Sequence, residues 1–194
     1  GYETLKSLTE GYNNVAIGYQ AGTSISSTTS TDNTIVGDRA GTGGSGVMAY
    51  CVALGSGALN GTGVRNSLMN TAVGMNSMGG SFGGTVNYNT AVGGNTMTGA
   101  LNAATYNVAL GYTALGSLTT GDYNVAVGYN AGNAMTTTTD TVLIGGLAGD
   151  AINSADADGT VAIGKNALTA LTDGQYNVAI GRSALGANKQ NDHN

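Results

Sequence analysis

Apolar residues and glycines recur along this chain with a short and regular period. A stretch of small apolar residues that ends in glycine appears ten times, as in GDYNVAVG at residues 121–128 and GQYNVAIG at residues 174–181. The ten glycines, spaced 17 to 19 residues apart, are Gly18, Gly37, Gly55, Gly74, Gly93, Gly111, Gly128, Gly145, Gly164 and Gly181. A fixed period of this length is typical of solenoids, in which each repeat packs only against its neighbours.

The three residues before each glycine alternate in size, with the period of two that is typical of a β-strand. Val or Thr comes three residues before the glycine, Ile, Val or Leu comes one residue before it, and the residue between them is Ala in eight repeats. The alternation predicts that the larger side chains form the structural core of the stack. The predicted core residues are Val15, Ile17, Val52, Leu54, Val108, Leu110, Val125, Val127, Val161, Ile163, Val178 and Ile180.

The alanines between these residues are then expected to form a flat outer face. Such a face lets a second sheet approach closely, so the alanines are candidates for a chain–chain interface. They are Ala16, Ala53, Ala72, Ala91, Ala109, Ala126, Ala162 and Ala179. A second inward patch follows each glycine, with an Ala such as Ala114 and leucines such as Leu115 and Leu118.

Asparagine comes four residues before the glycine in seven of the ten repeats. It tolerates left-handed backbone and bonds to its own main chain, so a repeated Asn predicts a repeated turn. Stacked in register, these side chains also form amide ladders. The predicted turn ladder consists of Asn14, Asn33, Asn70, Asn89, Asn107, Asn124 and Asn177.

One repeat cannot fold alone. It buries about four apolar side chains, worth roughly 1.5 to 3 kcal/mol each, against roughly 1 to 2 kcal/mol of backbone entropy per ordered residue. Stacking in parallel register joins the small patches into one core. The sequence therefore predicts an all-β fold, a parallel β-solenoid of about ten coils of 17–19 residues in one array over residues 1–194. Neither end reads as a capping repeat, so we expect an excerpt of a longer fibre or a subunit that stacks end to end.

Composition favours an ordered chain and excludes several functions. The chain has 34 glycines, no proline, 41% hydrophobic and 9% charged residues, and a net charge of −5. Six Lys and Arg residues argue against nucleic acid as a partner, and no apolar run approaches the roughly 20 residues that span a bilayer. The single histidine, His193, and the single cysteine, Cys51, leave no catalytic triad and no metal cluster. We expect no enzymatic activity and no cofactor.

Three surface features are weaker candidates for chemistry. The loop with Asp150, Asp156 and Asp158 lacks the spacing of an EF-hand, so it is interpreted as a solvated loop. An ice-binding face needs outward threonines, whereas Thr34, Thr71 and Thr90 share the slot of the predicted core valines.

Tyrosines beside the turns are candidates for surface contact with sugars or with another chain. Aromatic rings offer apolar area together with a polar hydroxyl. These candidates are Tyr19, Tyr112 and Tyr129.

The motifs NVAIG, NTAVG, NVALG and TVAIG resemble the head repeats of trimeric autotransporter adhesins, and more closely the YNVAIGYQAG-type arrays of phage tail-fibre and bacterial surface-fibre proteins. The resemblance spans nearly the whole chain. It implies a left-handed parallel β-roll, a homotrimer of three chains side by side, and attachment to a glycan or protein receptor. It also implies an extracellular location on a virion or cell surface.

These observations predict a structural fibre or adhesin module, the shaft or head of a tail fibre or bacterial surface fibre, which gives reach and multivalent attachment. One alternative is a subunit of a self-polymerising extracellular filament. Another is an ice- or glycan-binding solenoid.

Overall fold

The chain forms a parallel β-solenoid with an all-β architecture. The computed structural model describes residues 1–25, 29–43, 46–61, 66–153 and 157–187. No α-helix occurs in these ranges, and within them no helix is long and apolar enough to cross a membrane. The fold class expected from the sequence, a stack of parallel strands, is confirmed.

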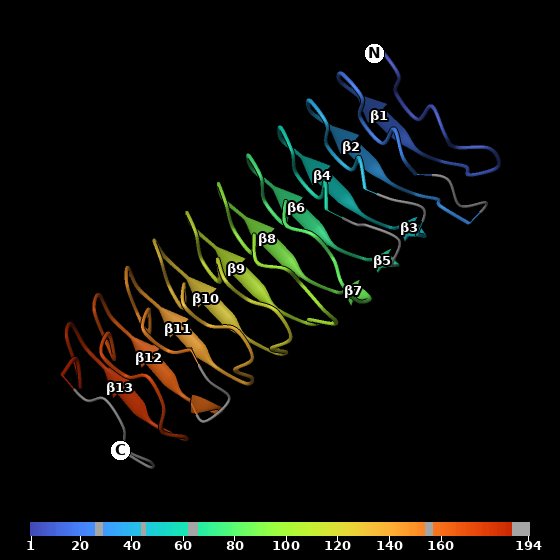
Figure 1. Ribbon diagram of the computed structural model, residues 1–194. Helices are drawn as coiled ribbons and strands as arrows, with labels where there is room; N and C mark the ends of the chain where they lie inside the picture. The colour runs from blue at the N-terminus through green and yellow to red at the C-terminus, as the bar shows by residue number, and fades with distance from the viewer. Residues whose placement is uncertain (26–28, 44–45, 62–65, 154–156, 188–194) are drawn as a thin grey trace.

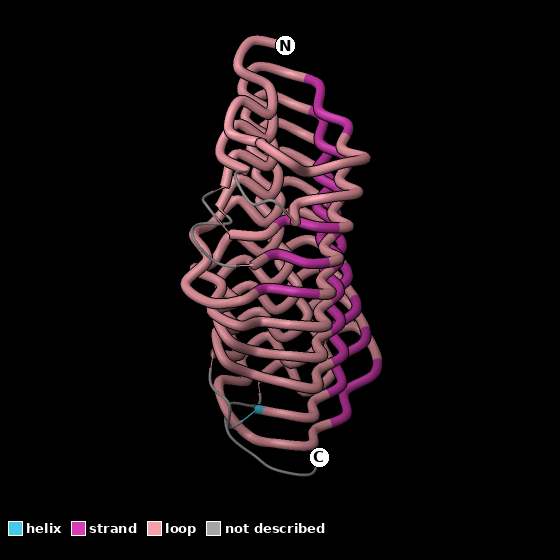
Figure 2. Tube along the Cα trace, turned by 90° about the vertical axis from the view of Figure 1, so that its right-hand side faces the viewer, coloured by secondary structure: helices cyan, strands magenta, loops and turns pink. Residues whose placement is uncertain are grey.

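Ten short strands lie side by side along the solenoid axis and form one parallel sheet, as Figure 1 shows. In spatial order they are β1 (Val15–Ile17), β2 (Thr34–Val36), β4 (Val52–Leu54), β6 (Thr71–Val73), β8 (Thr90–Val92), β9 (Val108–Leu110), β10 (Val125–Val127), β11 (Val142–Ile144), β12 (Val161–Ile163) and β13 (Val178–Ile180). Equivalent residues pair without a slip, as in Val108 with Val125 and Val125 with Val142. Figure 2 shows these strands following one another along one side of the molecule.

A second, smaller parallel sheet lies in the middle of the array. It contains β3 (Met48–Ala49), β5 (Ser67–Leu68) and β7 (Val86–Asn87), and an isolated bridge between Asn87 and Thr105 extends it. Outside the strands, the backbone of successive coils still pairs, for example from Leu115 N to Ala131 O at 3.0 Å. Each coil is therefore hydrogen-bonded to its neighbours around most of its path, which satisfies the buried peptide groups.

The strands face the opposite way from the prediction. The middle residue of each strand points into the core: Ala109 and Ala126 are fully buried, and so are Ile35 and Leu143, which replace Ala in two strands. The candidate interface residues Ala53, Ala72, Ala91, Ala109, Ala126, Ala162 and Ala179 all lie in the core of their own chain, and Ala16 packs against it. They cannot form an interface with another chain.

The residues predicted as core point outward. Ile17 is 60% exposed and Ile180 is 68% exposed. None of the twelve is buried, namely Val15, Ile17, Val52, Leu54, Val108, Leu110, Val125, Val127, Val161, Ile163, Val178 and Ile180. Period-2 alternation separates two faces of a strand but does not tell which face is inside.

The second apolar patch explains this orientation, because it already fills the interior. The prediction that residues after the glycine point inward is confirmed: Ala114, Leu115 and Leu118 are fully buried, and so are Leu168 and Leu171. These side chains approach the strand from the opposite wall of a narrow coil. The strand residue that faces them must therefore be small.

Volumes across the coil compensate each other. In six repeats Ala in the strand is followed six residues later by Leu or Met, as in Ala109 with Leu115. Where the strand carries a larger residue, the later residue is Gly, as in Ile35 with Gly41 and Leu143 with Gly149. A Cβ added at Gly149 would lie 2.9 Å from Leu143 Cδ2. The strand residue and the residue six positions later are therefore never both large, which avoids overpacking of the coil.

The glycine after each strand is required by the turn and by the next coil. Gly111 has a φ of 131°, a region that side chains strain to reach. A Cβ on it would lie 2.5 Å from Gly128 O in the following coil. The repeated glycine is therefore where successive backbones approach most closely.

The predicted asparagines form a buried amide ladder between coils. Asn107 Oδ1 accepts from Asn124 N at 2.9 Å and from Asn124 Nδ2 at 3.0 Å. Asn107 Nδ2 donates to Asn89 Oδ1 at 3.1 Å and to Gly121 O at 2.9 Å. Equivalent contacts join Asn14 to Asn33 and Asn70 to Asn89. The ladder is confirmed for these residues.

The turn beside the ladder differs from the prediction in one respect. The left-handed residue is the one before the asparagine, for example Tyr106 with a φ of 58° and Tyr123 with a φ of 57°, so assigning that conformation to Asn was wrong. The prediction that Asn bonds to its own main chain is confirmed at Asn177, where Nδ2 donates to Gly174 O at 2.8 Å. In one coil without Asn, Thr141 Oγ1 donates to Asn124 Oδ1 at 2.7 Å and continues the ladder.

Two neighbouring residues of one strand, each replaced by threonine, test which face of the strand is inside. Ala109→Thr should lower the free energy of unfolding by about 2 to 4 kcal/mol, because it overpacks the core and buries a hydroxyl. Val108→Thr should change it by less than about 1 kcal/mol, since its side chain points outward and Thr occupies this slot in three native strands. Urea titration of both variants measures the difference. A larger loss for Val108→Thr would contradict the observed orientation.

The amide ladder can be tested at Asn107. Asn107→Ala removes the acceptor of Asn124 N and a donor to two buried carbonyls, which should cost about 2 to 4 kcal/mol in unfolding free energy. Asn107→Thr should cost at least about 1 kcal/mol less, because its hydroxyl takes the place that Thr141 fills elsewhere. Equal losses for the two variants would show that the ladder contributes little to stability.

Candidate interaction surface

The outward face of the ten-stranded sheet is the main candidate for function. Each strand contributes two outward residues, a Val or Thr at its start and a Val, Leu or Ile at its end. Each of them repeats at the same place on the next strand because the register is continuous. The result is two parallel columns that run the length of the sheet and are aliphatic except at Thr34, Thr71 and Thr90. We call this surface the aliphatic face.

Two further columns flank the aliphatic face, one on each side of the strands. The leading column is the residue five before each repeat glycine: Asn13, Asp32, Tyr50, Met69, Tyr88, Tyr106, Tyr123, Asp140, Gly159 and Tyr176. The trailing column is the residue directly after it: Tyr19, Asp38, Ser56, Met75, Gly94, Tyr112, Tyr129, Gly146, Lys165 and Arg182. Both columns are rich in exposed tyrosine and methionine in the middle of the array.

Tyrosines of the leading column stack on each other. The ring centroids of Tyr88 and Tyr106 lie 4.8 Å apart, those of Tyr106 and Tyr123 lie 5.0 Å apart, and the rings are within 3° of parallel. This spacing is the distance between neighbouring strands. All three tyrosines remain exposed, with Tyr123 at 57%. They form a regular ridge rather than separate side chains.

The tyrosines selected from the sequence lie in the trailing column. Tyr112 and Tyr129 stack with centroids 6.1 Å apart, and Tyr19 stacks on Tyr2 at 5.5 Å. All three candidates are exposed, as a role in surface contact requires. The leading column was missed as a site, although five tyrosines at one slot of ten repeats were a visible signal.

Titratable groups do not assemble a catalytic centre in the described ranges. There, no group of three His, Cys, Asp or Glu side chains lies close enough to hold a metal ion. Burial raises the pKa of the Asp150 carboxyl, and the Asp158 carboxylate accepts a hydrogen bond from Thr139 N at 2.7 Å. Asp156 and His193 lie outside the described residues.

Cys51 takes the place of asparagine in the buried ladder. Its backbone N donates to Asn33 Oδ1 at 3.0 Å, and its Sγ donates to Ser67 O at 3.3 Å. Burial raises the pKa of the thiol, so the reactive thiolate is disfavoured. The interpretation of Cys51 as a structural residue agrees with this environment.

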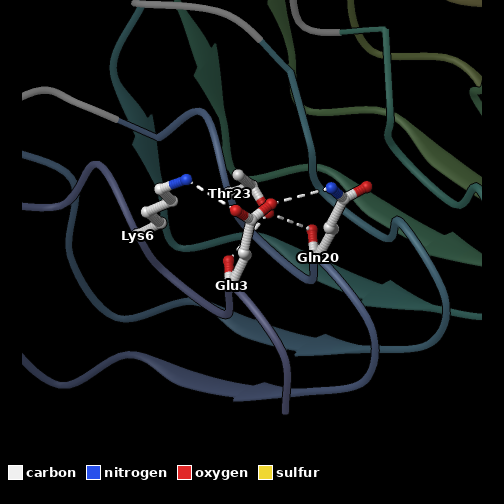
Figure 3. A network of polar contacts seen from close by, with 4 residues as sticks. All are labelled: Glu3, Lys6, Gln20 and Thr23. Carbon is white, nitrogen blue, oxygen red and sulfur yellow. Dashed lines mark hydrogen bonds and ion pairs between the residues drawn. The ribbon is translucent and has the colours of Figure 1, made fainter.

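A polar network at the first coil connects residues far apart in the sequence (Figure 3). The Glu3 carboxylate accepts from Lys6 Nζ at 2.5 Å and from Gln20 Nε2 at 2.9 Å, while Thr23 Oγ1 donates to Glu3 O at 2.9 Å. The bonds from Lys6 and Gln20 lower the pKa of the Glu3 carboxyl. The network joins the first coil to the next. Its ion pair contributes little to stability because Lys6 is exposed.

Comparisons with protein-family models, with curated proteins and with solved structures found no match. The function must therefore be argued from the surface itself.

Proposed function

We propose that this chain is a structural module of a surface fibre, in which three copies assemble side by side around a common axis. The carrying observation is that the aliphatic face is open to solvent on the single chain, where its side chains range from half-buried at Val127 to 68% exposed at Ile180. The proposed assembly is a homotrimer of left-handed rods, each with about ten coils, and it serves as a shaft or head that carries attachment sites away from a virion or cell. Its other proposed partners are glycan or protein receptors on the target surface.

The size of the exposed surface supports assembly. Ten strands spaced by about 4.8 Å give a length of about 45 Å, and the strand with its two flanking columns gives a width of at most about 20 Å. The resulting area of at most about 900 Å² is of the order of the roughly 800 Å² that one partner contributes to a stable interface. The flanking columns include polar residues such as Asp32 and Lys165, but the two central columns are mostly aliphatic and continuous, and large apolar patches of this kind are rare on soluble single chains.

The regularity of the face supports rods that lie parallel to each other. Every level of the sheet presents two outward side chains at the same spacing, a Val or Thr followed by a Val, Leu or Ile. Identical rods in parallel therefore bring like residues to one height, and each level adds the same small contact. The stability of such an interface increases with the number of coils, which suits a fibre that transmits force along its axis.

The orientation of the strands also removes one objection to an ice-binding function, because Thr34, Thr71 and Thr90 face outward. Only Thr71 and Thr90 lie on neighbouring strands, since β4 carries Val52 between Thr34 and Thr71. An array of two threonines is too short to match an extended lattice. The outward face favours contact with other apolar surfaces, and we expect no thermal hysteresis in solution.

A charge placed on the aliphatic face should separate the copies without unfolding them. Sedimentation equilibrium should give a mass of three chains for the unmodified protein and one chain for Val127→Lys, because three ammonium groups would be buried near the axis. The far-ultraviolet circular dichroism spectrum should stay unchanged, since Val127 does not face the core of its own chain.

Thr137→Lys is the matched control, because it adds the same charge at an exposed loop residue outside the face. This variant should retain the mass of three chains. A single-chain mass for the unmodified protein, or a three-chain mass for Val127→Lys, would contradict the proposal. Fibres that grow with concentration would favour the alternative of a self-polymerising filament.

A further inference from the structure

We infer that the two flanking columns meet across the boundary between copies, so that the leading column of one chain packs against the trailing column of the next. In the middle of the fibre this places Tyr106 of one copy against Tyr112 of its neighbour, and Tyr123 against Tyr129. The inference rests on the proposed side-by-side trimer. It assigns the tyrosines to the seam between chains rather than to a receptor site.

Symmetry requires two different edges to meet. A closed ring of three identical subunits has one kind of contact, which is heterologous: one surface of each subunit binds a different surface of the next. When three sheet faces turn toward a common axis, one edge of each face approaches the opposite edge of its neighbour. The leading and trailing columns are those edges. Rods in parallel bring residues of the same coil to about the same height.

Side-chain sizes in the two columns compensate in four of the ten coils. In three of these coils the leading residue is larger than the trailing residue of the same coil. In the fourth the trailing residue is the larger. These combinations are Tyr50 with Ser56, Tyr88 with Gly94, Asp140 with Gly146, and Gly159 with Lys165. Compensation of this kind fills space without overpacking. Packing within one chain already favours two of the glycines, because an added Cβ would lie 2.7 Å from the Tyr176 ring at Gly159 and 3.4 Å from the Tyr112 ring at Gly94.

Where both columns carry large residues, their chemistry suits contact. Tyr106 with Tyr112 and Tyr123 with Tyr129 are aromatic pairs, which favour edge-to-face or offset packing. Met69 with Met75 is an adaptable apolar pair. Tyr176 with Arg182 allows a cation–π contact.

One coil brings like charges together at the seam, because Asp32 would approach Asp38. The Arg39 guanidinium lies 4.0 Å from the Asp38 carboxylate in the same chain and offsets part of this charge. The remaining repulsion is confined to a single level near one end of the array.

The backbone of the leading column indicates that tyrosine is there for a reason other than the turn. Tyr88, Tyr106 and Tyr123 all have φ between 57° and 59°. This left-handed conformation costs most side chains roughly 1 to 2 kcal/mol, and Asn, Asp or Gly tolerate it better. Asn13, Asp32 and Gly159 occupy the same slot in other coils. Repeated use of the costlier residue points to a contact made by its ring.

The stacking of these rings favours a protein partner over a sugar. Sugars bind aromatic side chains through the ring face, but the rings of Tyr88, Tyr106 and Tyr123 cover each other's faces. The ridge offers ring edges and hydroxyls at a fixed spacing. Because stacking already restricts the rings, docking a neighbouring column costs little further rotamer entropy.

Paired cysteines test the seam directly. The double variant Tyr106→Cys/Tyr112→Cys, oxidised with diamide and alkylated before denaturation, should run as three covalently joined chains on a non-reducing gel. A bond within one chain is excluded, because β9 (Val108–Leu110) lies between the two residues and its three extended residues alone span about 10 Å, whereas a disulfide needs Cα atoms within about 7 Å. Each single variant, Tyr106→Cys or Tyr112→Cys, should stay a single chain.

A cysteine pair that is shifted by one coil tests the register between neighbouring copies. Tyr106→Cys/Tyr129→Cys is mismatched by one coil and should give at least tenfold less of the joined species. Joining by the mismatched pair alone, or joining by either single variant, would overturn the inference. Sedimentation of the unmodified protein and of the reduced double variant separates the two proposals. Three-chain masses without cross-linking refute the seam only, whereas a single-chain mass of the unmodified protein refutes the trimer itself.

Discussion

The structure depends on the narrow interior of each coil. The middle residue of each strand faces the residue six positions later, and the two walls of the coil are too close for both to be large. Leu115 from the turn therefore requires Ala109 in the strand, and Leu143 in the strand requires Gly149 in the turn. Residues such as Leu118 fill the rest of the interior, so the larger residues at the two ends of the strand point outward. The apolar surface of the rod is thus a consequence of how its core is packed.

Hydrogen bonds between coils set the spacing along the solenoid axis, while side-chain packing sets the width of each coil. The repeat glycines allow backbones to approach, and the asparagine ladder satisfies buried peptide groups between coils. Neither feature depends on the ends of the array, because each coil repeats the contacts of the one before. Columns of equivalent residues follow directly. A regular core therefore produces a regular surface, and this regularity favours assembly of several rods in register.

Much of the fold was predictable from the sequence. The glycine period located the strands, the alternation before each glycine identified them as β, and the register followed from aligning repeats such as Val108 with Val125. The inward patch at Leu115 and Leu118 was also predicted correctly. The facing of the strands was not, because alternation is symmetric and larger residues were assumed to be inside. Only the width of the coil decides between the two faces, and that width depends on how Ala109 and Leu115 meet across it.

The surface was less predictable than the fold. Because Val127 was predicted to point inward, the aliphatic face was not recognised as a surface. The left-handed turn was assigned to asparagine, although Tyr123 takes that conformation and Asn124 is buried. Tyr112 and Tyr129 were recognised as surface residues, but stacking between coils becomes visible only when the register and the turn are both known.

The most direct measurement is carbene photolabelling of the protein, read residue by residue at high and low concentration. Leu143 and Ile144 are neighbours that face opposite ways, which makes them a matched pair. Ile144 should be labelled in the dissociated chain and protected in the assembly, and Leu143 should be protected in both. Labelling of Leu143 with protection of Ile144 in the dissociated chain, or equal labelling of Ile144 at both concentrations, would contradict the account.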